Sequence, residues 1–397
     1  MLKKNFKFID LFCGIGGFHQ ALQNLGGECV FASDIDKYAI ETYKENYNID
    51  SGINIRDIKE ENIPVHDVLC AGFPCQAFSK AGRQKGFEDE TRGTLFFEIV
   101  RILKYHKTPY IILENVRNLA SHDDGNTWNV IKNSLKELGY VITETPIIVS
   151  PHQFGVPQIR ERVVILGVHE SVGIKEISVN VPNIDKNDID FLSSNILEHG
   201  EVDKKYYISE HEEKVLNCWD EFIHGIKEKV LGFPIWSFEF AKDYDYTTLK
   251  YPKWKENFIL RNRKLYENNK EFIDSWLKKW NYLQDFTTTE QKLEWQCGTD
   301  CESIWDAIIQ FRPSGIRVKR PNVFPALVAM VQIPIIAKVK RRLTPREAAR
   351  LQSFPDSFIC NKNDHQAYKQ FGNAVNVKVI EYMAKQLFKI KYTKEYK

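Results

Sequence analysis

The 397-residue sequence lacks any run of about 18 apolar residues, the length that a membrane-spanning helix requires. Its opening, MLKKNFKFIDLF, has neither the long apolar core nor the cleavage site of a secretion signal. The eight cysteines are scattered along the chain, which favours reduced thiols over a disulfide framework. Together these absences predict a cytoplasmic protein without a membrane segment.

The sequence also has little net charge. It carries +2 at pH 7, so any nucleic-acid site must be a local patch and not a property of the whole molecule. Between Phe311 and Pro345 there are eight Lys or Arg and no Asp or Glu. Such a run is commonly a solvated face; phosphate contact is the interpretation we prefer if the neighbouring region docks on a polyanion.

The motifs that bind phosphate-bearing nucleotides are missing. There is no Walker motif, no phosphate-binding lysine after the glycines, and no G-x-G-x-x-G spacing. What stands at residues 8–18, FIDLFCGIGGF, is a strand pattern followed by a G-x-G-G turn, with Gly14, Gly16 and Gly17. Glycines allow positive φ and close approach of a ligand, although a plain tight turn would use them too. A nucleoside cofactor without phosphates fits this turn better than ATP or NAD.

Two aspartates follow the glycine turn. Asp34 ends the next predicted strand, 24 residues after Asp10, near the place where an acidic residue takes ribose hydroxyls. Asp57, after the letters INIR, could cap a third strand over an adenine ring. At either position the alternative is a helix N-cap, which is the commoner role of an aspartate before a helix.

The first 168 residues alternate between short apolar runs and helical patterns. This alternation, with fully apolar strands, predicts an α/β fold with a doubly wound, mostly parallel sheet. We expect strands at 6–12, 28–33, 66–73, 109–116, 141–150 and 162–168, and helices at 17–26, 36–47, 94–106 and 128–139.

The alternation stops after residue 168, and the region to about 338 holds seven of the eight tryptophans. Segments 213–232 and 269–283 have helical patterns, and regularity returns with helices within 343–356 and 374–390. We therefore expect a middle domain, with its own tryptophan core, to interrupt an outer one, with domains at 1–175, 176–338 and 339–397. Cys297 and Cys301 lack a second ligand pair, so no metal site is expected.

Cys75 lies just past the apolar run of LCAGFPCQAFSK, residues 69–80, where a loop should begin. A thiol there could act as a thiolate nucleophile. Glu114, in ILENV, ends the next predicted strand and would lie at the same sheet edge. Alone it could be a surface or capping residue; beside a cysteine it is a candidate proton donor.

Arg160 and Arg162 precede another predicted strand, in the letters PQIRERVVIL. Residues two apart on a strand face the same way, so both arginines could reach one anionic site. A solvated edge is the alternative.

Together these motifs resemble the DNA (cytosine-5) methyltransferases of bacterial type. The resemblance covers about residues 6–168 and 342–390 and is carried, in the family's order, by DLFCGIGGF, GFPCQAFS, RQKGFEDETRGTLFFE, ENV, QIRER, RLTPREAARLQSFPD and QFGNAV. It implies the Rossmann-like fold of S-adenosylmethionine-dependent methyltransferases, interrupted by a smaller, irregular target-recognition domain. Two departures are Cys13, where Ala is frequent, and Asp34 with Ile35, where Glu and Trp are common.

The resemblance also implies roles for single residues. Cys75 would be the nucleophile, Glu114 would hydrogen-bond N3 of the target base, Arg162 would contact its O2, and Arg160 would lie near the phosphate. The cofactor, S-adenosyl-L-methionine with S-adenosyl-L-homocysteine as product, would contact Gly14, Gly16, Phe18, Asp34, Ile35, Asp57, Ile58, Pro74, Leu95, Asn373 and Val375. DNA contacts are expected at Gln76, Ser79, Arg83, Lys85, Arg317, Lys319 and Arg320, with residues 247–250 and 258–264 as candidates for groove contacts.

The implied function is sequence-specific methylation of carbon 5 of a cytosine flipped out of double-stranded DNA. The implied setting is the bacterial cytosol, near the nucleoid, as a monomer and as the modification enzyme beside a separate restriction endonuclease. Three other interpretations remain open at this point: a tRNA cytosine methyltransferase on the same scaffold, a non-catalytic DNA-binding module, and an NAD oxidoreductase.

Overall fold

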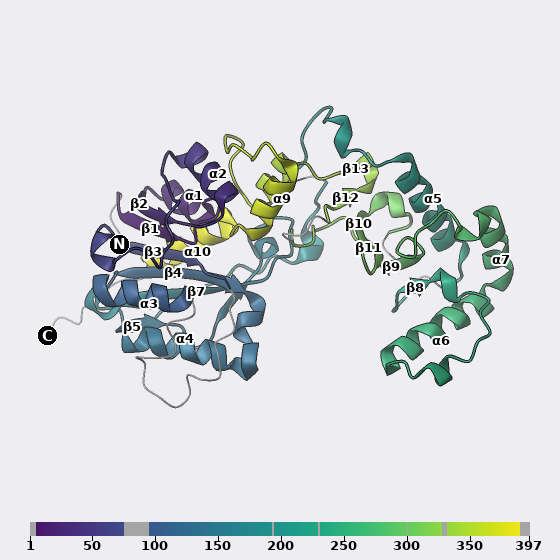
Figure 1. Ribbon diagram of the computed structural model, residues 1–397, viewed down its shortest axis with the longest axis horizontal. Helices are drawn as coiled ribbons and strands as arrows, with labels where there is room; N and C mark the ends of the chain where they lie inside the picture. The colour runs from purple at the N-terminus through teal and green to yellow at the C-terminus, as the bar shows by residue number, and fades with distance from the viewer. Residues whose placement is uncertain are drawn as a thin grey trace. The chain divides into compact units, whose positions relative to one another are not determined.

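The structure is a computed structural model that describes residues 5–74, 95–192, 194–228, 231–299, 301–327 and 332–389 (Figure 1). The chain forms two compact units. The first unit comprises residues 1–189, 325–330 and 345–397, and the second comprises 190–324 and 331–344. The chain therefore leaves the first unit near residue 189, returns to it briefly at 325–330, and returns finally at residue 345.

A mixed sheet forms the centre of the first unit. Its strands lie in the order β2-β1-β3-β4-β7-β5, with β6 paired to β7. Strands β1 to β4 are parallel, whereas β7 runs antiparallel to β4, β5 and β6. The bounds are β1 (Lys7–Leu11), β2 (Glu28–Ser33), β3 (Val68–Gly72), β4 (Tyr110–Val116), β5 (Tyr140–Ile142), β6 (Ile147–Val149) and β7 (Arg162–His169). The predicted α/β fold is confirmed, with the parallel part confined to four strands.

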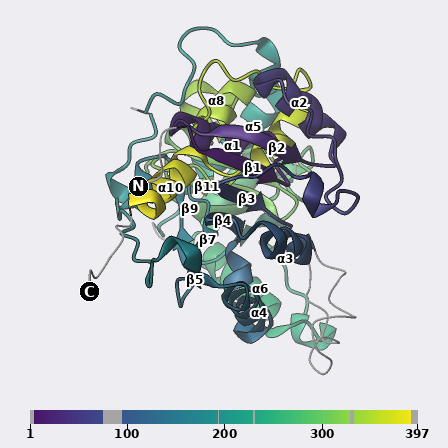
Figure 2. The ribbon, with the colours of Figure 1, turned by 90° about the vertical axis from the view of Figure 1, so that its left-hand side faces the viewer.

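Helices cover both faces of this sheet. Helices α3 (Leu95–His106) and α4 (Asn126–Glu137) pack on one face, against alternate strand residues such as Ile9 and Ile111. On the other face lie α1 (Gly17–Asn24) and α10 (Val377–Lys389) (Figures 1 and 2). The Phe388 ring of α10 packs there against the rings of Phe6 and Tyr110. Three further helices of this unit are α2 (Lys37–Tyr47), α8 (Pro345–Leu351) and α9 (Asp364–Asn373).

Two predicted strands of this unit are wrong in detail. Residues 51–58, which are all described, form turns and no strand, so Asp57 does not end a strand as predicted. The single strand predicted at 141–150 is two short ones, β5 and β6. In both places apolar residues are present, but the runs are too short for the two-residue period of a strand to predict its bounds.

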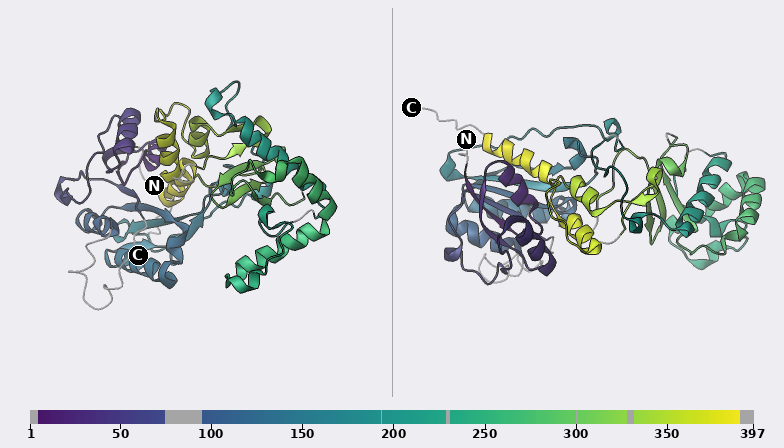
Figure 3. Two further views of the ribbon diagram at one scale, coloured as in Figure 1. Left: turned by 45° about the vertical axis from the view of Figure 1, so that its right-hand side comes forward. Right: turned by 90° about the horizontal axis from the view of Figure 1, so that it is seen from above.

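The second unit is more regular than its sequence indicates. It contains a six-stranded sheet in the order β13-β12-β10-β11-β9-β8. The strands are β8 (Ile235–Trp236), β9 (Lys292–Gln296), β10 (Ile308–Arg312), β11 (Gly315–Lys319), β12 (Ile335–Ile336) and β13 (Arg341–Arg342). Helices α5 (Glu210–Gly225), α6 (Lys253–Asn268) and α7 (Lys270–Lys279) complete the unit (Figure 3). Trp219, Trp276 and Trp295 are buried in its core, as predicted, whereas Trp254 is 57% exposed.

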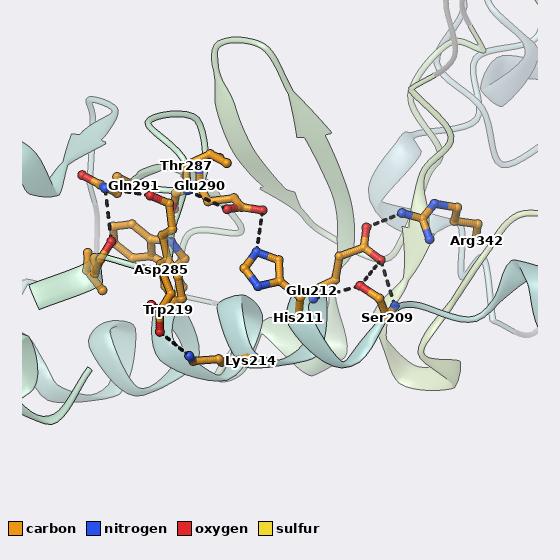
Figure 4. A network of polar contacts seen from close by, with 12 residues as sticks. Ser209, His211, Glu212, Lys214, Trp219, Asp285, Thr287, Glu290, Gln291 and Arg342 are labelled. Carbon is orange, nitrogen blue, oxygen red and sulfur yellow. Dashed lines mark hydrogen bonds and ion pairs between the residues drawn. The ribbon is translucent and has the colours of Figure 1, made fainter. Parts of the chain in front are cut away.

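A polar network fixes the start of α5 (Figure 4). Ser209 and Glu212 form a reciprocal capping box, and Arg342 of β13 pairs with Glu212. Two turns further on, the Trp219 indole donates to the backbone oxygen of Glu290, 2.8 Å away. The helix is therefore tied at its first turn to the sheet and at its middle to the loop before β9.

Candidate active site

A cavity of about 430 Å³ opens in the first unit where β1, β2, β3 and β4 end. Parallel strands bring their carboxyl ends to one sheet edge, and the antiparallel β7 begins at this same edge. Ligands of open α/β sheets bind at this edge, and the volume lies in the range of small-molecule sites. Residues predicted to contact a ligand that do line the cavity are Gly14, Phe18, Asp34, Ile35, Pro74, Leu95, Glu114, Arg160, Arg162, Asn373 and Val375.

The glycine turn forms the floor of the cavity. Gly14 has φ 53° and a Cβ there would meet nothing within 4 Å, so its backbone faces open space. Gly16 has φ 85°, but a Cβ there would lie 2.3 Å from the Tyr47 ring. Gly14 is thus placed to contact a ligand, while Gly16 is required by packing beneath the turn.

Asp34 holds the turn in place. Its Oδ2 accepts a hydrogen bond from the Gly14 backbone N–H at 2.8 Å, and its Oδ1 accepts from the N–H groups of Ile35 and Asp36. Ile35 beside it is 76% exposed at the rim. An acceptor next to an exposed apolar side chain suits a ribose joined to a flat base.

Another wall of the cavity is formed by residues that the sequence analysis did not predict to contact a ligand. Ile53, Asn54 and Ile55 line the cavity, whereas Asp57 and Ile58 are not part of its lining. The letters INIR, residues 53–56, therefore indicate the correct part of the chain, but these residues form no strand. The positions that line the cavity are 53–55, not 57 and 58.

Glu114 and Arg162 form an ion pair at the cavity. The Arg162 Nε lies 2.9 Å from the Glu114 Oε1, and Glu114 is only 9% exposed. Burial raises the pKa of the Glu114 carboxyl, and the charges of Arg162 and Arg160 oppose that rise without cancelling it. The site therefore combines a fixed cation with a carboxyl that takes up a proton at higher pH than a solvated glutamate does.

Asn115 stands in the ENV motif, but the sequence analysis gave it no role of its own. Its side-chain N–H donates to the backbone oxygen of Phe73 at 2.8 Å, and its Oδ1 accepts from the Val116 N–H. It thereby fixes the Phe73–Pro74 segment, directly before Cys75. Cys75 itself lies outside the described residues, as do Gln76, Ser79, Arg83 and Lys85.

Arg160 has a different environment from Arg162. It is 3% exposed, and its guanidinium donates to three backbone oxygens: Leu327 at 2.9 Å, Gly372 at 2.8 Å and Ala374 at 3.0 Å. Strand β7 begins only at Arg162, so the rule that residues two apart face the same way does not extend to Arg160.

Helix α9 closes the cavity on its remaining side. Lys369 lines the cavity and pairs with Asp36 at 2.8 Å, and Gln370 donates to the backbone oxygen of Tyr38. The Lys369 ammonium is thus already matched by a carboxylate. The donor set fits an uncharged nucleoside better than a phosphate group.

The remaining predicted contacts lie in the second unit. Arg317 and Lys319 are the partly exposed positions of β11, and Arg317 pairs with Glu294 on β9 at 2.8 Å. Arg320 follows the strand, and its Nη2 lies 2.6 Å from the position that a Cβ on Gly298 would take. Within the described ranges, no three His, Cys, Asp or Glu side chains are grouped as metal ligands. None of the helices that the structure describes combines the length and apolarity needed to cross a bilayer.

Comparison with known proteins identifies one family. The model of the family described as C-5 cytosine-specific DNA methylase matches residues 6–389. The type II methyltransferase M.HpaII of Haemophilus parainfluenzae is 37% identical, over 97% of this chain and 90% of that protein. M.AluI of Cellulosimicrobium cellulans is 32% identical, over 97% of this chain and 93% of that protein.

Solved structures agree on the fold. A prophage-encoded DNA modification methyltransferase of E. coli superposes with a TM-score of 0.57 at 23% identity, covering 97% of this chain and 99% of that one. The DNMT2 protein of Spodoptera frugiperda gives 0.54 at 22% identity, over 97% and 100% of the two chains.

Proposed function

Because the chain belongs to the C-5 cytosine-specific DNA methylase family, we propose that it methylates carbon 5 of cytosine at a specific site in double-stranded DNA. S-adenosyl-L-methionine would be bound in the cavity and would supply the methyl group. The observation that supports this most is the Glu114–Arg162 pair, which lies on the cavity wall beside the segment leading into Cys75.

The cavity residues would bind and orient the cofactor. Gly14 lets it approach the backbone, Asp34 offers carboxylate oxygens to ribose hydroxyls, and Ile35 covers one side of the base. Asn373 and Val375 form the opposite wall.

Cys75 would begin the chemistry. Carbon 5 of cytosine is a poor nucleophile, so addition of the Cys75 thiolate to carbon 6 is needed to make it reactive. The electron pair displaced by this addition moves toward N3, where a proton from Glu114 completes a neutral enamine. Carbon 5 then takes the methyl group and loses its own proton to water, the Cys75 thiolate leaves carbon 6, and N3 returns its proton to the Glu114 carboxylate, which restores the aromatic ring.

Glu114 is suited to the proton step by its burial. A raised pKa keeps a larger protonated fraction near neutrality, and a positioned acid contributes about 10²–10⁴ in rate. Arg162 fixes one carboxyl oxygen, Oε1, while Oε2 lies toward Gly72, which has no side chain to occupy the space. Arg162 would also donate to O2 of the base. The target base must leave the duplex to reach this site, at a cost of a few kcal/mol.

The second unit would recognise the DNA sequence. The exposed face of α6 carries Lys253, Arg261 and Lys264 beside Trp254, and β11 adds Arg317 and Lys319. Such cations contact phosphates, and their neighbours can reach base edges. By analogy with its type II relatives, the protein would act as the modification enzyme beside a separate restriction endonuclease. It would do so as a monomer in the bacterial cytosol.

Transfer of tritium from labelled S-adenosyl-L-methionine tests the function. Wild type should label duplex DNA, and Cys75→Ala should not. Equal labelling by the two proteins would reject the mechanism. Labelling of tRNA in place of DNA, in the same assay, would reject the substrate.

A further inference from the structure

Arg160 is a buried cation that the mechanism above does not use. Within the part of the chain that the structure describes, its two terminal nitrogens donate to backbone oxygens from two stretches that are far apart in sequence, while its Nε has no partner there. A buried charge costs free energy unless its hydrogen bonds are made, so this arrangement is held in place by those three bonds. We propose that Arg160 is a positioning residue that couples cofactor binding to DNA binding, a role that rests on the proposed function.

The first stretch is a wall of the cofactor cavity. Gly372 and Ala374 both accept from the Arg160 Nη2 and both line the cavity. The next residue, Val375, packs so tightly on the glycine turn that a Cβ on Gly17 would lie 2.6 Å from its backbone oxygen. A ligand that settles against the turn therefore also presses on the segment that Arg160 holds.

The second stretch is the short return segment at 325–330. Leu327 is buried and accepts from the Arg160 Nη1 at 2.9 Å. This segment belongs to the first unit, but the residues before and after it, 190–324 and 331–344, belong to the second. Arg160 thus fixes a point on the chain connection to the unit proposed to read DNA.

Only an arginine suits this position. The three acceptors are reached by two nitrogens of one planar group, and a lysine ammonium is a single point of charge on a flexible stem. Arg160 also lies two residues before Arg162, so the same segment carries the partner of Glu114. Burial lowers the pKa of the Arg160 guanidinium to about 9, which still leaves it charged near neutrality.

When the binding of two ligands is coupled, each ligand changes the affinity for the other by the same factor, which is typically about 5- to 150-fold. The probes are S-adenosyl-L-homocysteine and a duplex oligonucleotide that carries the methylated site. We expect the wild type to bind the duplex at least about fivefold more tightly with S-adenosyl-L-homocysteine present. In Arg160→Lys the ratio should fall to within about twofold of one.

Arg346→Lys is the matched control. Arg346 also donates to backbone oxygens of the first unit, those of Pro355 and Phe358, but it does not line the cavity. Arg346→Lys should keep the wild-type ratio. A wild-type ratio in Arg160→Lys, or an equal loss in both variants, would overturn the proposal. If wild type methylates no DNA at all, the proposed function fails instead, and the two failures are distinguished.

Hydrogen exchange of the wild type gives a test that does not depend on a folded variant. Addition of S-adenosyl-L-homocysteine should slow exchange in peptides that contain residues 372–375 and, together with them, in those that contain Leu327. Protection at 372–375 without any change at Leu327 would contradict the coupling.

Discussion

At the scale of single residues, the site depends on a carboxyl whose environment opposes its ionisation. Glu114→Gln removes the proposed proton donor but keeps the size of the side chain. We expect kcat to fall by about 10²–10⁴ while DNA binding is retained. Single-turnover methylation with an excess of enzyme measures the first quantity, and fluorescence anisotropy measures the second. An unchanged kcat would remove Glu114 from the proton step.

The raised pKa of Glu114 also predicts a pH dependence. In the proposed mechanism the protonated form is active, so the rate should fall as pH rises through the Glu114 pKa, which lies above the usual value of about 4.3. In Glu114→Gln this falling limb should be absent, because the amide does not titrate. A falling limb of the same midpoint in both proteins would assign it to another group.

A comparison of alanine substitutions at Gly16 and Gly26 distinguishes the cost of side-chain crowding from the cost of backbone strain. Both have left-handed φ, 85° and 87°, but a Cβ on Gly16 would meet the Tyr47 ring and a Cβ on Gly26 would meet nothing within 4 Å. Gly16→Ala should therefore lower the free energy of unfolding by about 1–3 kcal/mol more than Gly26→Ala. Urea unfolding of both variants measures the difference. Equal losses would mean that Tyr47 moves aside freely.

At the scale of elements, α5 depends on the capping box formed by Ser209 and Glu212. Burial by itself would raise the pKa of Glu212, but hydrogen bonds from Ser209 and Arg342 outweigh it and the pKa is lowered. The carboxylate therefore stabilises the fold above its unfolded pKa, and this contribution is lost as pH falls through the folded value.

Glu212→Gln tests this element. We expect it to lower the free energy of unfolding by roughly 1 kcal/mol at pH 7, because the amide can still cap the helix but loses the ion pair with Arg342 and the negative charge at the helix N-terminus, and by progressively less below about pH 4. Glu210→Gln, in the same first turn but exposed, is the control and should have little effect at either pH. A loss for Glu212→Gln that is the same at pH 3 and pH 7 would contradict the charge-based account.

The elements that sequence predicts are those with long apolar patterns. The prediction for β2 matches its bounds, and those for β3 and β4 differ by one or two residues at the ends, because buried parallel strands are continuous apolar runs. Strands β8, β12 and β13 have two residues each and exist only through their pairing with neighbours. No local period can indicate strands of that length.

The residues of the candidate site also differ in how far the sequence could predict them. Gly14, Asp34 and Glu114 could be predicted because each lies near the carboxyl end of a recognisable strand or just after it. The environment of Arg160 could not, since its acceptors lie more than 160 residues away in sequence. Asn115 was missed because its role, holding the backbone of Phe73, depends on two strands being neighbours.

At the scale of the whole molecule, a net charge of +2 means that DNA affinity must come from local patches. Lys264→Ala, on the exposed face of α6, should weaken binding and reduce the slope of log K against log salt by about 1 in magnitude. Lys278→Ala, on α7, is the control and should leave the slope unchanged. Titrations of duplex DNA at several salt concentrations measure both slopes. Identical slopes for Lys264→Ala and wild type would exclude a phosphate contact at that residue.

The most direct test of the central claim is bisulfite sequencing of DNA from cells that express the chain or its Cys75→Ala variant. The claim is that a thiol, a proton-donating carboxyl and a methyl-donor cavity meet at one edge of the first sheet. The account predicts 5-methylcytosine at one recurring sequence with the wild type and at none with Cys75→Ala. Unmodified DNA in both cultures, or the same methylated sequence in both, would contradict it.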